Sequence, residues 1–270
     1  MHAPYRLLRR AQGDANPFAF KTMKDNFYIG GYFLVKPANV SDWQNMELLP
    51  KIIYTPCDCI CDVYPGSEGL SWTSDTKENK KKWEKELGVS DENAKDIRKF
   101  CDKLFELEKL GWSSIFLDLE SVYRFKNFIN PTVSKDWKIL CIATTQKYVE
   151  DFNKEVNSND GQDGVCIMLR KEIICPDIMN GFRGFEILGF EYGGCHSFMC
   201  NSLETDYSTK LNISFNRNGL IDNFEDAEKA GDFTNSPEVG AEPVLWQPWA
   251  IIEITEANNL LHLSAKSSAR

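Results

Sequence analysis

Runs of apolar and β-branched residues, separated by polar segments, predict a series of strands. The clearest run covers residues 27–35 and combines aromatic with β-branched side chains, a composition typical of a strand. Two shorter strands are expected at 51–54 and 57–63, on either side of Pro56. The remaining strand predictions are 114–119, 138–144, 165–174, 182–192, 211–215 and 249–255.

Apolar residues at a spacing of three and four predict helices between these strands. The clearest helix spans 90–110, where Ser90 is a good amino-terminal cap and Gly111 stands where a helix should stop. Its apolar stripe consists of Ile97, Phe100, Cys101, Leu104, Leu107 and Leu110. Further helices are predicted at 76–87, 146–156 and 222–230.

This order of elements predicts an α+β (mixed α/β) fold. Strands and helices alternate in the middle of the chain, but strands follow one another later, which favours one layered domain with a mostly antiparallel or mixed sheet flanked by helices. Residues 1–22 lack periodicity and are expected to form a flexible basic extension. We expect the globular domain to span 23–256 and residues 257–270 to form a flexible tail.

Composition narrows the class of protein. The 270 residues carry a net charge of −9, which disfavours a nucleic-acid partner because phosphate contacts need a basic surface. No apolar run approaches the roughly 18 residues of a membrane span, so no membrane association is expected. Nine cysteines, an odd number, and the lack of a secretory signal favour reduced thiols and a cytoplasmic location.

Cys57, Cys59 and Cys61 form the most conspicuous motif. If this segment is a strand, alternate side chains point to one face, and three sulfur atoms could converge on a soft metal ion. A closed zinc site needs a fourth ligand, which His196, Cys195 or Cys200 would have to supply. The alternative interpretation is three small buried side chains, and with it we expect no metal and no cofactor.

Two further pairs offer chemistry, although neither predicts a catalytic site by itself. Cys195 and His196 are a nucleophile and a base, but adjacent side chains diverge, and such pairs normally join distant residues. Asp118 and Glu120 end a predicted strand at a spacing of two and could share a face. The alternatives are a structural turn and a strand end that enters solvent, so no catalytic residue is predicted.

The stretch 222–242 is strongly acidic. Seven carboxylates and a single lysine give it a net charge of −6. This pattern fits either a solvated helix and loop or a contact surface for a basic partner, which would accelerate association. The candidate partner-binding residues are Asp222, Glu225, Asp226 and Glu228, with Trp246 and Trp249 as aromatic anchors unless these two lie in the core.

The carboxy-terminal half resembles bacterial immunity proteins of polymorphic toxin systems. The segments that carry the resemblance are 184–191 (GFEILGFE), 195–201 (CHSFMCN), 218–221 (NGLI) and 246–249 (WQPW), and the resemblance extends over about residues 23–256. Immunity proteins are small cytosolic proteins that bind and neutralise a cognate toxin domain. The resemblance implies stoichiometric binding of a toxin protein without turnover, and it identifies no functional residue.

Two alternatives stay open at this point, together with the oligomeric state. One is an enzyme that uses Cys195 with His196, or Asp118 with Glu120. The other is a non-catalytic adaptor protein with no toxin partner. A toxin gene directly upstream is expected only for an immunity protein.

Overall fold

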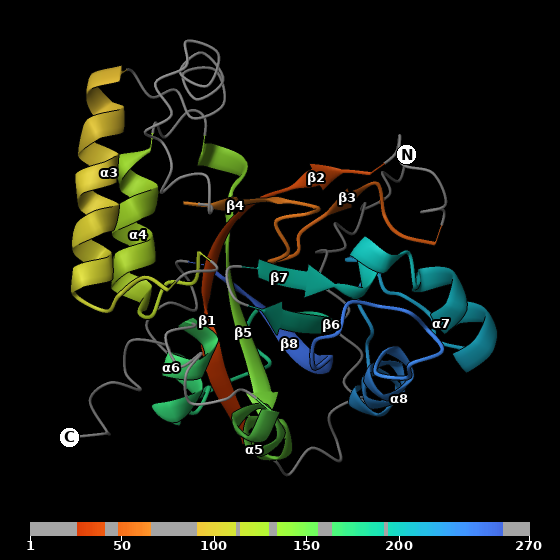
Figure 1. Cartoon of the computed structure of the whole chain (residues 1–270). Helices are drawn as coiled ribbons and strands as arrows, with labels where there is room; N and C mark the ends of the chain where they lie inside the picture. The colour runs from red at the N-terminus through yellow and green to blue at the C-terminus, as the bar shows by residue number, and fades with distance from the viewer. Residues whose placement is uncertain are drawn as a thin grey trace, which may run out of the picture.

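A six-stranded sheet runs through the centre of the molecule (Figure 1). The structure is a computed structural model that describes residues 26–40, 48–65, 91–111, 114–129, 134–155, 164–191 and 194–255. The expected extension at 1–22, the tail at 257–270 and the helix at 76–87 lie outside the described residues.

The sheet has the strand order β4-β1-β5-β8-β6-β7, and every neighbouring pair is antiparallel. Its strands are β1 (Phe27–Lys36), β4 (Asp62–Tyr64), β5 (Lys138–Thr145), β6 (Phe182–Glu191), β7 (Gly194–Ser197) and β8 (Gln247–Ile254). A separate two-stranded sheet pairs β2 (Ala38–Asn39) with β3 (Ile52–Ile53). The strands predicted at 27–35, 138–144, 182–192 and 249–255 are therefore confirmed.

Near-continuous apolar sequence explains which strands are central. In β1, β5 and β8 almost every residue is buried, so both faces of these strands are covered. Strands that are covered on both faces lose the usual alternation of apolar and polar residues. The short strands β4 and β7 lie at the two edges of the sheet.

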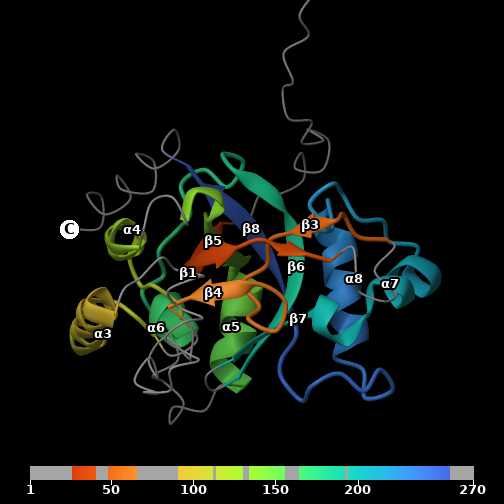
Figure 2. The same cartoon turned by 90° about the horizontal axis from the view of Figure 1, so that it is seen from above.

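Helices cover the sheet in groups (Figures 1 and 2). The pair α3 and α4 lies at one flank, whereas α7 and α8 lie at the opposite flank next to β6 and β8. Helices α5 and α6 pack on β5 and β1. Their bounds are α3 (Asp91–Glu106), α4 (Leu119–Phe128), α5 (Gln146–Glu155), α6 (Gly164–Arg170), α7 (Glu204–Leu211) and α8 (Phe224–Thr234). This arrangement confirms a single α+β domain with helices flanking an antiparallel sheet.

Gly31 allows the segment that contains Ile115 and Phe116 to pass close to β1. The register between β1 and β5 shifts between Ile29 and Gly31, and Gly31 has a φ of 143°. A Cβ atom here would lie 2.3 Å from the side chain of Ile115. Next to it, Tyr32 and Phe116 exchange backbone hydrogen bonds of 3.0 and 2.8 Å.

Two strand predictions were wrong because short apolar runs do not distinguish a strand from a helix. The segment 165–174 forms mostly helix α6, whose buried face consists of Gly164, Val165, Cys166, Met168 and Leu169. In the segment 211–215, Leu211 ends α7, and Phe215 forms only an isolated bridge with Ile221.

Two further predictions change at the ends of elements. In the segment 114–119, Phe116 forms only isolated bridges, and Leu119 begins α4. Helix α3 ends at Glu106 rather than at residue 110, because Glu108 adopts a φ of 51°. Among the described residues, no helix has the length and apolar character needed to cross a membrane.

Candidate functional site

Three cysteines from two distant segments meet in one cluster. Cys57 and Cys59 lie in a turn after β3, in which the backbone N–H groups of Ile60 and Cys61 both donate to the carbonyl of Cys57. Cys200 lies in the 3₁₀ helix η2 (Phe198–Asn201), directly after β7. The chain therefore brings together sulfur atoms that are 143 residues apart in sequence.

The sulfur atoms of this thiol cluster (Cys57, Cys59 and Cys200) all lie within 4.8 Å of one another. The Sγ atoms of Cys57 and Cys200 are 2.9 Å apart, and the backbone N–H of Ser197 donates to Cys200 Sγ at 3.4 Å. Cys57 is buried, Cys200 is half-buried and Cys59 is exposed. The cluster thus extends from the core to the surface.

Hydrogen bonding makes Cys200 the most acidic thiol of the cluster. The hydrogen bond from Cys57 lowers the pKa of Cys200 to about 7; burial opposes this effect, and the N–H of Ser197 adds to it. The same hydrogen bond, together with burial, raises the pKa of Cys57. Desolvation raises the pKa of Cys59. Cys57 and Cys200 therefore share one S–H···S hydrogen bond, in which either sulfur can be the donor.

Cys61 does not join this cluster, so Cys57, Cys59 and Cys61 do not share one strand face, and the favoured expectation of three buried side chains holds for Cys57 and Cys61 but not for the exposed Cys59. The segment is a turn rather than a strand, and alternate side chains do not share a face there. Cys61 Sγ points to the carbonyl of Ile53 at 3.6 Å. Burial raises the pKa of Cys61 to about 12. Its place in the cluster is taken by Cys200.

A buried carboxyl group ties the two cysteine-bearing segments together. Glu186 of β6 is fully buried, and its Oε1 accepts hydrogen bonds of 2.6 Å from Thr55 Oγ1 and from Ser197 Oγ. Thr55 Oγ1 in turn accepts from the backbone N–H of Cys57 at 3.2 Å. One carboxyl oxygen therefore fixes the position of both segments.

Cys195 and His196 do not converge. In β7 the side chain of Cys195 is buried, whereas His196 is half-buried on the other face of the strand. His196 Nε2 is 2.9 Å from Glu191 Oε1, and His196 Nδ1 is buried without a hydrogen-bond partner. The adjacent pair therefore lacks the geometry of a nucleophile and its base.

Asp118 and Glu120 do not share a face either. Asp118 is the amino-terminal cap of α4, where its carboxylate accepts hydrogen bonds of 2.9 Å from the N–H and from the hydroxyl of Ser121. Glu120 is exposed in the first turn of the helix. The expected strand end is a helix start, and Asp118 has a structural role there.

The four candidate acids on and directly before α8 differ in their exposure. Asp222 and Glu225 are exposed. Asp226 accepts hydrogen bonds from the side chain of Asn223, which caps the helix, and from Lys229. Glu228 accepts from both Lys147 and Tyr148 at 3.0 Å. Asp222 also accepts from Asn216 at 2.8 Å, and Glu225 lies 3.3 Å from Lys229, so all four carboxylates have partners within the molecule.

Trp246 and Trp249 belong to the core, which rules out their use as exposed anchors in this structure. Their exposed fractions are 1% and 0%. Trp249 packs edge-on against Phe152 and Phe190, and Trp246 donates its indole N–H to the carbonyl of Glu242. The aromatic part of the expected contact surface is therefore absent at these two positions.

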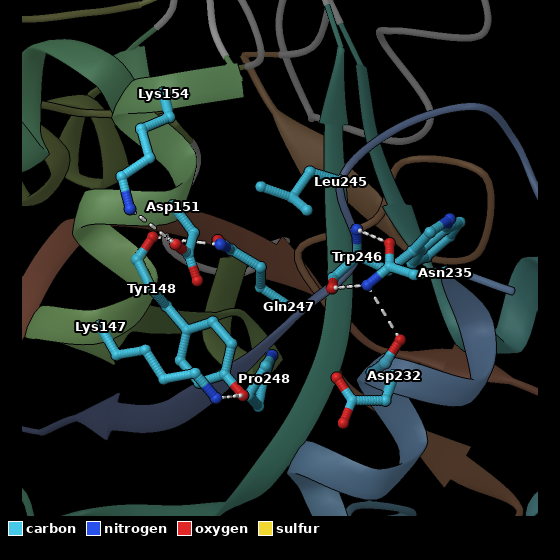
Figure 3. A pocket seen from close by; sticks show the side chains of 11 residues that line it. Lys147, Tyr148, Asp151, Lys154, Asp232, Asn235, Leu245, Trp246, Gln247 and Pro248 are labelled. Carbon is cyan, nitrogen blue, oxygen red and sulfur yellow. Dashed lines mark hydrogen bonds and ion pairs between the residues drawn. The ribbon is translucent and has the colours of Figure 1, made fainter.

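A hollow of roughly 250 Å³ lies between α5, α8 and the start of β8 (Figure 3). Two lysines on its α5 side are already paired, Lys147 with Glu228 and Lys154 with Asp151. At its base, buried Gln247 donates to the carbonyl of Tyr148. Sequence reasoning missed this hollow because three separate segments line it and none of them carries a motif.

Comparison of the chain with protein-family models, with curated proteins and with solved structures finds no significant match. The resemblance to immunity proteins therefore stays a prediction.

Proposed function

We propose that this protein binds a basic partner protein stoichiometrically through the flank that carries α8. The resemblance to immunity proteins makes a cognate toxin domain the expected partner. The observation that carries the proposal is a group of exposed carboxylates on and beside α8. We call this group the acidic face, and it consists of Asp222, Glu225, Asp232 and Glu238.

Charge and exposure support this choice of surface. Lys229 is the only basic residue between positions 222 and 242, and it already pairs with Glu225 and Asp226 of its own helix. Exposed charges of one sign steer an oppositely charged protein toward the contact and raise the association rate. Asp226 and Glu228 are left out of the acidic face because their side chains are only half-exposed, whereas its four members are exposed.

The test neutralises the acidic face with Asp222→Asn, Glu225→Gln, Asp232→Asn and Glu238→Gln. The partner is the toxin domain encoded by the gene directly upstream. We expect association to slow on the order of tenfold at low salt and its salt dependence to flatten, because steering is lost. Stopped-flow or surface-based kinetics measure both effects. Folding should be retained, since exposed charges contribute little to stability.

A matched control removes the same amount of charge from the opposite flank. Asp96→Asn, Asp102→Asn, Glu106→Gln and Glu120→Gln change exposed carboxylates on α3 and α4, far from α8 in both views (Figures 1 and 2). This control should associate nearly as fast as the unchanged protein. Equal slowing in both variants, or no slowing in either, would remove the acidic face from the mechanism. The lack of an upstream toxin gene would contradict the immunity role.

A further inference from the structure

The thiol cluster has the donor set and the construction of a metal site. We propose that Cys57, Cys59 and Cys200 bind one thiophilic cation with a filled d shell, Cu⁺ or Zn²⁺. This site is separate from the acidic face and does not depend on the proposed partner. Thiolate sulfur selects soft and borderline ions such as these over hard cations such as Mg²⁺ or Ca²⁺.

The sulfur positions are close to those that one ion requires. A metal–sulfur bond of about 2.3 Å places three sulfurs around one ion at separations near 4 Å. The cluster holds all three within 4.8 Å, with Cys57 and Cys200 at 2.9 Å. Small side-chain rotations that open the close pair are enough to admit an ion, and the exposed Cys59 gives it a route in from solvent.

The segments that carry the sulfurs are held in place before any ion binds. Glu186 accepts from Thr55 on one segment and from Ser197 on the other, each at 2.6 Å. The N–H of Ser197 also donates to Cys200 Sγ, a contact that stabilises the thiolate form of this ligand. Such supporting hydrogen bonds orient ligands and strengthen metal binding. This feature distinguishes the cluster from three cysteines that happen to be neighbours.

With three sulfur donors, Cu⁺ and Zn²⁺ would be coordinated differently. Three sulfurs can complete the coordination of Cu⁺ alone, whereas Zn²⁺ prefers four ligands. Among the described residues, the group of possible ligands within 4.8 Å contains only these three cysteines. Zn²⁺ would therefore add a solvent molecule on the exposed side of Cys59. In either case each bound thiol releases its proton to solvent, and no oxidation or reduction takes place.

The experiment titrates the full chain, reduced with a phosphine and freed of metal, with Cu⁺ or with Zn²⁺ in competition with a chromophoric chelator. Native mass spectrometry gives the stoichiometry. We expect one equivalent of at least one of the two ions to bind. Cys59→Ser and Cys200→Ser should each weaken binding by at least about tenfold, because each removes a ligand. Cys59 is exposed, so Cys59→Ser leaves the core unchanged.

The matched control is Cys61→Ser, which removes a thiol from the same turn but outside the cluster. It should bind the ion as tightly as the unchanged protein. Tight binding of Cu⁺ alone indicates the three-sulfur site, and binding of both ions indicates the site with a solvent ligand. The proposal is overturned if neither ion competes with the chelator, if Cys59→Ser binds as well as the unchanged chain, or if Cys61→Ser loses binding equally. The variant that lacks the acidic face should bind the ion normally, which separates this test from that of the proposed function.

Discussion

Glu186 shows how one buried residue can connect the core to the candidate site. Its side chain is completely buried, Oε1 accepts two hydrogen bonds, and Oε2 has no hydrogen-bond partner. Burial raises the pKa of Glu186 from its ordinary 4.5 to about 8; the hydrogen bonds from Ser197 and Thr55 act in the opposite direction, and nearby Cys200 adds to the increase. The protonated acid is therefore the form that the fold accommodates best at neutral pH.

We predict that this residue makes stability depend on pH. Between pH 4.5 and about 8, Glu186 keeps its proton in the folded protein but has lost it in the unfolded chain, because folding raises its pKa. The stabilisation is complete below this window and is lost as pH rises through it. The expected loss is on the order of 5 kcal/mol, for a pKa raised from 4.5 to about 8 at about 1.4 kcal/mol per pKa unit. Denaturant unfolding at pH values on either side of the window measures it.

Glu186→Gln should remove most of this pH dependence, because the amide stays neutral and keeps an oxygen for Thr55 and Ser197. Glu106→Gln, at an exposed carboxylate of α3, should leave the dependence unchanged. A pH dependence in Glu186→Gln as steep as in the unchanged protein would show that other groups cause it.

Two glycines in different elements should respond to alanine in opposite directions. In β1, Gly31 combines a φ of 143° with a Cβ position 2.3 Å from Ile115. Gly31→Ala is expected to cost roughly 2–4 kcal/mol of stability, from backbone strain and overpacking. In α8, a Cβ on Gly231 would meet Pro248 at an ordinary 3.5 Å. Gly231→Ala should leave stability unchanged or raise it by up to about 1 kcal/mol, because alanine favours the helix.

Denaturant unfolding of both alanine variants checks this prediction. Backbone strain and close packing act at Gly31, whereas helix propensity acts at Gly231. Equal destabilisation by the two substitutions would contradict the close approach of β1 to Ile115.

Sequence alone predicts the long elements but not the short ones. The runs that became β1, β5, β6 and β8 are long and rich in β-branched or aromatic residues, which makes them recognisable. The run that became α6 is short and apolar, and such a run has no decisive period. Cap chemistry at α4 was misread as a strand end because Asp118 follows an apolar run.

The candidate sites depend on contacts between distant segments, which one sequence does not reveal. Cys57 and Cys59 were recognisable from their spacing, and Cys200 was one of three possible additions. Cys200 is the third member of the cluster because the pairing of β6 with β7 places η2 beside the turn at 57–61. Likewise, the sequence allowed Trp246 and Trp249 to be either anchors or core residues, and only their burial in the structure, with Trp249 packed against α5 and β6, shows that they are core.

At the scale of the described molecule, the two flanks differ in their balance of acids and bases. Helix α8 and the residues on either side of it carry the acidic face, whereas acids and bases on α3 form pairs such as Arg98 with Asp102. A protein that acts by covering its partner needs one such surface and no turnover. The amount of protein required for neutralisation is therefore the property that separates a binding role from catalysis.

The most direct test of the central claim is a titration of the proposed toxin partner with this protein, in which the remaining toxin activity is measured. Stoichiometric binding predicts a linear loss of activity that ends at about one molecule of this protein per toxin domain. A complex of the same ratio should be recovered by size-exclusion chromatography. Complete neutralisation at far less than one molecule per toxin domain would contradict stoichiometric binding and indicate an enzyme.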